Sequence, residues 1–218
     1  MDLSRTALVL IDMQKESKYG IENVDGAVAA AVPLIDACRE SGVRVIYTRH
    51  IGRVDAIGLP NKEVLDEQGR PVYYRSDSEN MQVIDELAPH PEDIVIDKQR
   101  WSGFYETSLD LMLRSLDIKH LIIGGFVTDG CLMTTVFDGY ARDYQINLVK
   151  DISAATNSGS HKAAILMMAN WVYDIEIFDS AEMVKKLRGE TYRSWQSSAP
   201  DQLQFTAETL NPVFAELG

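Results

Sequence analysis

Three residues far apart in the chain carry side chains that together can break an amide bond: Asp12, Lys98 and Cys131. A cysteine sulfur can attack a carbonyl carbon, and a carboxylate can take the thiol proton and deliver it to a leaving amine. An ammonium group beside the sulfur favours the thiolate. Asp12 and Lys98 stand at the ends of short aliphatic runs, and Cys131 follows a glycine-rich segment after a third run, which is typical of residues at strand ends.

The elements that would position these residues follow from the alternation of aliphatic runs with helical stretches. This alternation predicts an α/β fold with a doubly wound, mostly parallel six-stranded sheet covered by helices on both faces. The expected strands are 6–12, 43–48, 93–97, 120–124, 146–149 and 172–178, and the expected helices are 24–40, 107–116, 131–144, 160–171 and 181–187. Because the carboxyl ends of parallel strands share one edge, we expect the three side chains to converge there.

Two regions interrupt the alternation within an otherwise single domain, residues 1–187. Residues 49–80 form a long charged insertion, and loops of this length in a compact domain are usually functional, so we expect it near the active site. Residues 188–218 form a polar tail after the last expected strand. The tail is expected either to dock on a partner subunit or to fold back on its own domain.

The composition excludes several classes of protein. The 218 residues include 21 Lys and Arg against 33 Asp and Glu, a formal net charge of −12. Such a surface repels phosphate backbones and anionic lipids, so we expect neither a nucleic-acid nor a membrane partner. No apolar run approaches the roughly 18 residues of a membrane span, the N-terminus lacks a secretory pattern, and two cysteines are too few for a disulfide framework. We therefore expect a cytoplasmic protein.

The two cysteines differ in setting. Cys131 stands at the start of an expected helix, where the helix dipole and unpaired amides favour a thiolate and can hold an oxyanion. The residues alone leave Cys131 balanced between a nucleophile and a small buried hydrophobe. Cys38 lies inside an amphipathic helix and is expected to be a core residue.

Three sequence blocks, in order, resemble the isochorismatase-like cysteine hydrolase family, which includes nicotinamidases, N-carbamoylsarcosine amidases and ureide-cleaving amidohydrolases. The blocks are LVLIDMQ at 8–14, DK at 97–98 followed by SGFYETSL at 102–109, and GGFVTDGCLMTT at 124–135. The resemblance covers residues 5–187 and points to the amidohydrolase branch. It implies a small polar amide or ureide as substrate, and a homo-oligomer, either a dimer or a tetramer.

The resemblance also implies a role for each matching residue. Asp12 would be the general base and acid, Cys131 the nucleophile, and Lys98 the cation that lowers the thiol pKa and orients the site. The Phe126–Val127 peptide bond would be cis, and the backbone N–H groups of Val127 and Cys131 would form the oxyanion hole. The expected reaction is hydrolysis of a C–N bond through a thioester, with release of ammonia or an amine.

Further residues are candidates for the substrate pocket, namely Gln14, Trp101, Phe104 and Tyr105, although core packing also explains the aromatic ones. Members of the family that bind carboxylated ureides often use a cation. The candidates are Arg49, Arg53, Arg75 and Arg100, each of which is also explained as a solvated surface charge.

The sequence predicts no metal and no cofactor. Metal-dependent nicotinamidases pair an aspartate with two histidines after the second strand, whereas here that region holds His50 alone. The other histidines are scattered, and one imidazole does not make a metal site. The chain lacks Cys-x-x-Cys, a dinucleotide-binding glycine pattern and a P-loop. Two alternatives stay open: an isochorismate-type vinyl-ether hydrolase, and a non-catalytic binding member of the fold.

Overall fold

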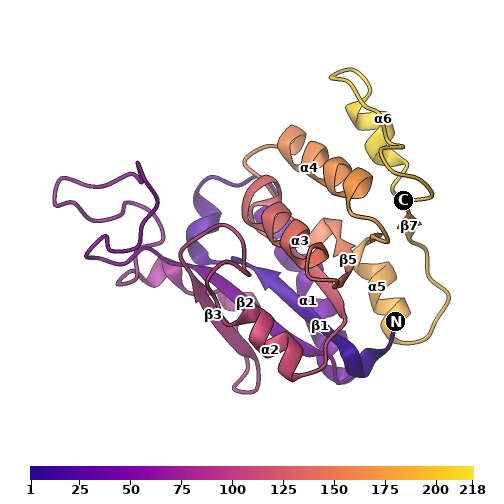
Figure 1. Ribbon diagram of the computed structural model, residues 1–218, viewed down its shortest axis with the longest axis horizontal. Helices are drawn as coiled ribbons and strands as arrows, with labels where there is room; N and C mark the ends of the chain where they lie inside the picture. The colour runs from indigo at the N-terminus through magenta and orange to yellow at the C-terminus, as the bar shows by residue number, and fades with distance from the viewer.

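The computed structural model describes residues 1–218 and is built around a seven-stranded sheet in the order β3-β2-β1-β4-β5-β6-β7 (Figure 1). The strands are β1 (Thr6–Ile11), β2 (Arg44–His50), β3 (Ile94–Lys98), β4 (His120–Gly125), β5 (Gln145–Val149), β6 (Glu176–Phe178) and β7 (Trp195–Gln196). The first six run parallel, and β7 pairs antiparallel with β6. The mostly parallel sheet is confirmed, and the seventh strand, which the sequence did not predict, comes from the tail.

Helices cover both faces of the sheet. They are α1 (Val24–Glu40), α2 (Leu109–Ser115), α3 (Met133–Tyr140), α4 (Ser158–Trp171), α5 (Ser180–Leu187) and α6 (Leu210–Ala215). Residues of α2, α3, α4 and α6 pack into one hydrophobic core, and those of α1 and α5 into the other. No helix combines the length and the hydrophobicity that crossing a bilayer requires.

The central strand β1 explains why its sequence is an unbroken apolar run. All six of its residues are buried. Ala7, Val9 and Ile11 belong to one core, whereas Leu8 and Leu10 belong to the other. Successive side chains of a strand point to opposite faces, so a strand covered on both faces carries no polar alternation.

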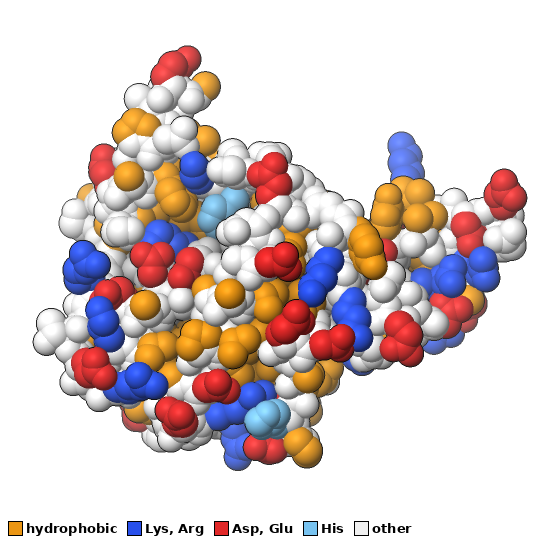
Figure 2. Space-filling view, turned by 180° about the vertical axis from the view of Figure 1, so that it is seen from behind, with side chains coloured by type: hydrophobic (Ala, Val, Ile, Leu, Met, Phe, Trp, Pro, Cys, Tyr) orange, Lys and Arg blue, Asp and Glu red, His pale blue; other side chains and the backbone are white.

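The insertion between β2 and β3 forms a long projection, here called the arm, which comprises residues 51–78. It contains no helix or extended strand, and it stands out from the body at the left of Figure 1. Its base is closed by hydrogen bonds from Gly52 N to Tyr74 O (2.8 Å) and from Ser76 N to Gly52 O (2.9 Å). The arm exposes the large apolar side chains of Ile57, Val64, Leu65, Val72 and Tyr73. Hydrophobic side chains of this projection are visible in orange at the right of Figure 2.

The tail, residues 188–218, folds back on its own domain. It supplies β7 to the sheet edge, and α6 packs on α4. Two of its own residues, Leu203 and Leu217, are buried in the hydrophobic core of the domain. Asn170 of α4 holds the backbone of Leu203 from both sides, accepting from its N–H at 2.9 Å and donating to its carbonyl at 3.2 Å.

Candidate active site

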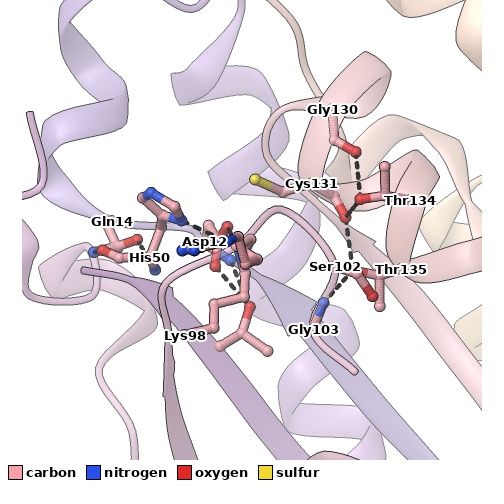
Figure 3. Close-up of polar contacts among 12 residues, drawn as sticks. Asp12, Gln14, His50, Lys98, Ser102, Gly103, Gly130, Cys131, Thr134 and Thr135 are labelled. Carbon is pink, nitrogen blue, oxygen red and sulfur yellow. Dashed lines mark hydrogen bonds and ion pairs between the residues drawn. The ribbon is translucent and has the colours of Figure 1, made fainter. Parts of the chain in front are cut away.

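Asp12, Lys98 and Cys131 meet at the carboxyl edge of the sheet, as their positions in the sequence predicted. Asp12 follows β1, Lys98 ends β3, and Cys131 lies in a π-helical turn (Thr128–Leu132) between β4 and α3. Asp12 Oδ2 is 2.6 Å from Lys98 Nζ, and Cys131 Sγ lies within 4.8 Å of the Asp12 carboxylate. Because β2 separates β1 from β3, the long Lys98 side chain reaches across the end of β2, and the Cys131 sulfur points toward the pair (Figure 3).

The two oxygens of the Asp12 carboxylate have different surroundings. Oδ1 accepts a hydrogen bond from the Thr48 hydroxyl at 2.7 Å, and the Asp12 backbone N–H donates to the Thr48 carbonyl at 3.1 Å. Oδ2 is buried and ion-paired with Lys98. A backbone φ of 49° turns Asp12 out of the strand. One carboxylate oxygen is thus held by Thr48, and the other lies between Lys98 and the Cys131 side.

Lys98 is a buried ammonium group. Its side chain has no exposed surface, and Nζ donates to the Arg100 carbonyl at 2.9 Å in addition to its ion pair with Asp12. Burial acts to lower the pKa of Lys98, but Asp12 and Cys131 outweigh it, so the pKa lies above its ordinary value. The charge therefore persists inside the protein, where it is only weakly screened.

The state of the Cys131 thiol differs from the sequence expectation. Burial, followed by the negative charge of Asp12, raises its pKa to about 12, and the opposing effect of Lys98 is smaller. Lys98 lowers the pKa as expected, but desolvation and the neighbouring carboxylate outweigh it, so the net shift is upward. Cys131 rests as a thiol, and it needs a base to become a nucleophile.

The segment before Cys131 is shaped by close backbone packing. The Phe126–Val127 peptide bond is cis, as the resemblance implied. Gly125 has a φ of 125°, and a Cβ there would lie 2.2 Å from the Ile11 carbonyl oxygen, so only glycine fits. The Val127 N–H makes no backbone hydrogen bond within the protein, which leaves it available to an incoming oxygen.

The block at residues 102–109 is connected to the backbone of Cys131 through Thr135. The Thr135 hydroxyl donates to the Cys131 carbonyl at 2.6 Å and accepts from the Gly103 N–H at 2.8 Å (Figure 3). Ser102 bonds to Asp138 of α3. Residues 102–109 and 124–135 are therefore in direct contact, which explains why both blocks occur in the sequence pattern of the family.

His50 belongs to the site, although sequence reasoning set it aside as a lone histidine. It ends β2, and its Nδ1 lies 3.5 Å from Lys98 Nζ. A ring nitrogen also lies within 4.8 Å of the Asp12 carboxylate and the Cys131 sulfur. Burial, and then Lys98, lowers its pKa to about 4, so the imidazole is neutral at pH 7. The sequence feature that could have identified His50 is its position at the end of β2, the strand between β1 and β3.

Tyr74 is a second residue that the sequence did not reveal. It comes from the base of the arm, with a φ of 50°, and its ring meets His50 edge to face at 5.4 Å. Burial raises its pKa to about 12, so the phenol stays neutral. No pattern in the sequence marks it, because the return of a long loop is not encoded in local periodicity.

Two of the four expected pocket residues have other positions. Gln14 is fully buried, and its amide holds the His50 backbone, accepting from N–H at 2.8 Å and donating to the carbonyl at 3.0 Å. Phe104 is a core residue stacked on Tyr144. These two were expected to meet substrate, but both are engaged within the protein.

The other two expected pocket residues are at the surface. Trp101 is 64% exposed and Tyr105 is 51% exposed. Tyr105 lines a shallow hollow of about 410 Å³ beside α3, together with Arg100, Met133 and Phe137. A larger cavity of about 470 Å³ lies apart from the triad, between the starts of α1 and α4.

The four arginines considered as carboxylate ligands are not equivalent. Three are paired with aspartates of the same chain: Arg49 with Asp97, Arg53 with Asp55, and Arg75 with Asp77. The Arg100 guanidinium forms no ion pair and donates instead to the carbonyls of Gly58 (2.6 Å) and Gln99 (2.7 Å). Arg100 is therefore the one of the four with an uncompensated charge.

Comparison with known proteins places the chain in a family. The sequence model of the isochorismatase domain matches residues 6–177. The chain belongs to the isochorismatase family. It is 30% identical over 207 residues to a ureidoacrylate amidohydrolase, RutB, of Methylorubrum extorquens, covering 83% of this chain and 84% of that protein.

Solved structures of the family agree with the fold. A cysteine hydrolase from Pseudomonas syringae superimposes with a TM-score of 0.77 at 26% identity, covering 87% of this chain and 95% of its own. An N-carbamoylsarcosine amidase from Thermoplasma acidophilum gives a TM-score of 0.68 at 29% identity, covering 82% and 98%. The protein is an isochorismatase-family hydrolase with amidohydrolase relatives.

Proposed function

We propose that this protein is a cysteine amidohydrolase that cleaves a C–N bond of a small amide or ureide through a thioester. The observation that carries the proposal is the close approach of Asp12, Lys98 and Cys131 at the carboxyl edge of the sheet. It unites a nucleophile, a base and a fixed positive charge. The amidohydrolase relatives support the same reaction class.

The first step forms the thioester. Asp12 Oδ2 takes the Cys131 proton as the sulfur attacks the carbonyl carbon, because the high pKa of the thiol leaves too little thiolate for direct attack. The carbonyl oxygen becomes an oxyanion that the backbone N–H groups of Val127 and Cys131 stabilise. Asp12 then returns the proton to the leaving nitrogen, the C–N bond breaks, and ammonia or an amine departs.

The second step hydrolyses the thioester. A water molecule attacks the same carbonyl carbon while Asp12 accepts a water proton, and the oxyanion forms again at the same N–H groups. The C–S bond then breaks, and Asp12 returns the proton to the sulfur. Lys98 keeps its charge throughout and stabilises the carboxylate and the thiolate as they form.

The charges around the site indicate what the substrate carries. The ammonium of Lys98 is neutralised by Asp12, and three of the four nearby arginines are paired. Arg100 is the group that can hold a carboxylate without breaking an ion pair of the protein. A small ureide or amide with a carboxylate directed to Arg100 therefore fits best, whereas an uncharged amide would leave this arginine unused.

Ammonia release across a panel of amides and ureides tests the proposal. The panel contains nicotinamide, carbamoylated amino acids, ureidoacrylate, biuret and maleamate, each also tested with Cys131→Ser. We expect cysteine-dependent release from at least one carboxylated member. Silence across the panel combined with turnover of isochorismate would overturn C–N hydrolysis in favour of ether cleavage.

A further inference from the structure

The active site holds a set of three atoms suited to a metal ion. One oxygen of Asp12, one ring nitrogen of His50 and the sulfur of Cys131 lie within 4.8 Å of one another. Carboxylate, imidazole and thiolate are the three ligand types of zinc sites, with bonds of about 2.0–2.3 Å. Tetrahedral bonds of that length place neighbouring ligand atoms roughly 3.3–3.8 Å apart, so side-chain movements of about 1 Å would close the set.

We propose that Asp12, His50 and Cys131 form an inhibitory site for Zn²⁺ and similar divalent transition metals. The ion is not part of the reaction: it takes the sulfur and the carboxylate that the reaction uses. On binding, the S–H bond of Cys131 breaks, a Zn–S bond forms, and the proton leaves to solvent with no change of oxidation state. The binding stands on the geometry alone, whereas the inhibition rests on the proposed function.

The protein already holds these ligands in place. The Thr48 hydroxyl fixes the Asp12 carboxylate through Oδ1, at 2.7 Å, and Oδ2 has only Lys98 as a partner. Gln14 clamps the His50 backbone on both sides. Partners that orient the ligands beforehand strengthen metal binding, because less ordering remains when the ion arrives.

Lys98 opposes the metal. Its ammonium is 2.6 Å from Asp12 Oδ2 and 3.5 Å from His50 Nδ1, so it stands beside two of the three ligands. A divalent ion must displace this contact and then remain next to a like charge. The site therefore binds metal less tightly than its ligands alone would allow. Removing Lys98 should abolish turnover yet strengthen metal binding, two effects of opposite sign.

Cobalt titration tests the site without any substrate. Co²⁺ bound to a thiolate gives a near-ultraviolet charge-transfer band, so the band reports sulfur ligation directly. We expect one equivalent to produce it in the native protein, and Cys131→Ser to remove it. Cys38→Ala, which changes the other free cysteine, should leave it unchanged.

Two further variants test whether all three residues bind the metal or whether the sulfur of Cys131 binds it alone. His50→Phe keeps a ring against Tyr74 but removes the nitrogen ligand, and it should weaken cobalt binding by about tenfold or more. Lys98→Met should tighten it by about tenfold or more. Equal affinity in His50→Phe and the native protein would overturn the proposal, as would absence of the band from both folded native protein and folded Lys98→Met.

Inhibition is measured separately. With a substrate from the panel, Zn²⁺ should reduce the native rate reversibly, and excess chelator should restore it. His50→Phe should resist Zn²⁺ relative to its own uninhibited rate, whatever that rate is. Full hydrolysis by Cys131→Ser would overturn the proposed function but would leave the cobalt result standing, so the two failures can be told apart.

Discussion

The carboxyl edge of the sheet and the arm beside it are built in opposite ways. At the edge, Asp12 and Lys98 are each almost fully buried and joined directly to strands with ladder hydrogen bonds. The arm has no extended strand or helix and exposes apolar side chains to solvent. Positions fixed by strands suit reacting groups, whereas loops vary in sequence and conformation without disturbing the core. The contrast places the reacting groups on the rigid edge and leaves the arm free to vary.

One aromatic contact joins the arm to the reacting groups. Tyr74, from the arm, packs on His50, which ends β2 and neighbours Lys98. Changes at the edge should therefore alter the chemical step, changes at this contact should alter substrate binding, and changes at the far end of the arm should alter neither.

Cys131→Ser should have the largest effect. Loss of the sulfur removes the covalent route, so kcat should fall by on the order of 10³-fold or more while the circular dichroism spectrum is unchanged. Steady-state ammonia release measures the rate. A rate within a few fold of the native one would contradict the assignment of chemistry to the edge.

Asp12→Asn should reduce kcat by on the order of 10²–10⁴-fold, because the amide cannot accept the thiol proton. The same change should lower the pKa of Cys131, since the Asp12 charge helps to raise it, whereas Lys98→Met should raise that pKa further. The pH dependence of Cys131 alkylation, followed by mass spectrometry, measures both shifts. Shifts in the same direction for the two variants would contradict these roles.

Tyr74→Ala should raise KM by about two- to tenfold and change kcat little, because it removes the aromatic contact that holds the base of the arm against His50 beside the site; such contacts are worth about 0.5–1.5 kcal/mol. Tyr74→Phe keeps the ring and serves as the matched control, with a KM close to the native value. A drop in kcat with constant KM would show that Tyr74 affects the chemical step and not substrate binding.

Ile57→Asp, on the outer part of the arm, should have the smallest catalytic effect. Its side chain is 66% exposed, so kcat and KM should each change by less than about twofold. Steady-state ammonia release measures both constants, and a larger change in either would contradict the assignment of the reaction to the edge.

The sequence predicted the features that depend on strand ends and local periodicity. The parallel sheet and the convergence of Asp12, Lys98 and Cys131 follow from where aliphatic runs stop, and α1 at residues 24–40 follows from helical periodicity. Features that depend on long-range packing were not predictable in this way. Tyr74 reaches the site only because the arm returns to Gly52, and Gln14 turns inward only because the His50 backbone lies within its reach.

The net pKa of Cys131 was not predictable from the sequence. A helix start and a lysine both favour a thiolate, and Lys98 does lower the pKa. The net shift is upward because the sulfur is buried and Asp12 lies near it, and neither is visible before the chain is folded.

The central place of β1 has a consequence for amide hydrogen exchange. Its backbone is hydrogen-bonded to β2 on one side and β4 on the other, with both faces covered. Exchange there requires opening that approaches global unfolding, whereas the amides of the arm exchange through small local openings. The backbone that carries Asp12 should stay closed through the fluctuations that admit substrate. Deuterium labelling would then show fast exchange in peptides from the arm and slow exchange in peptides from β1, the strand that Asp12 follows.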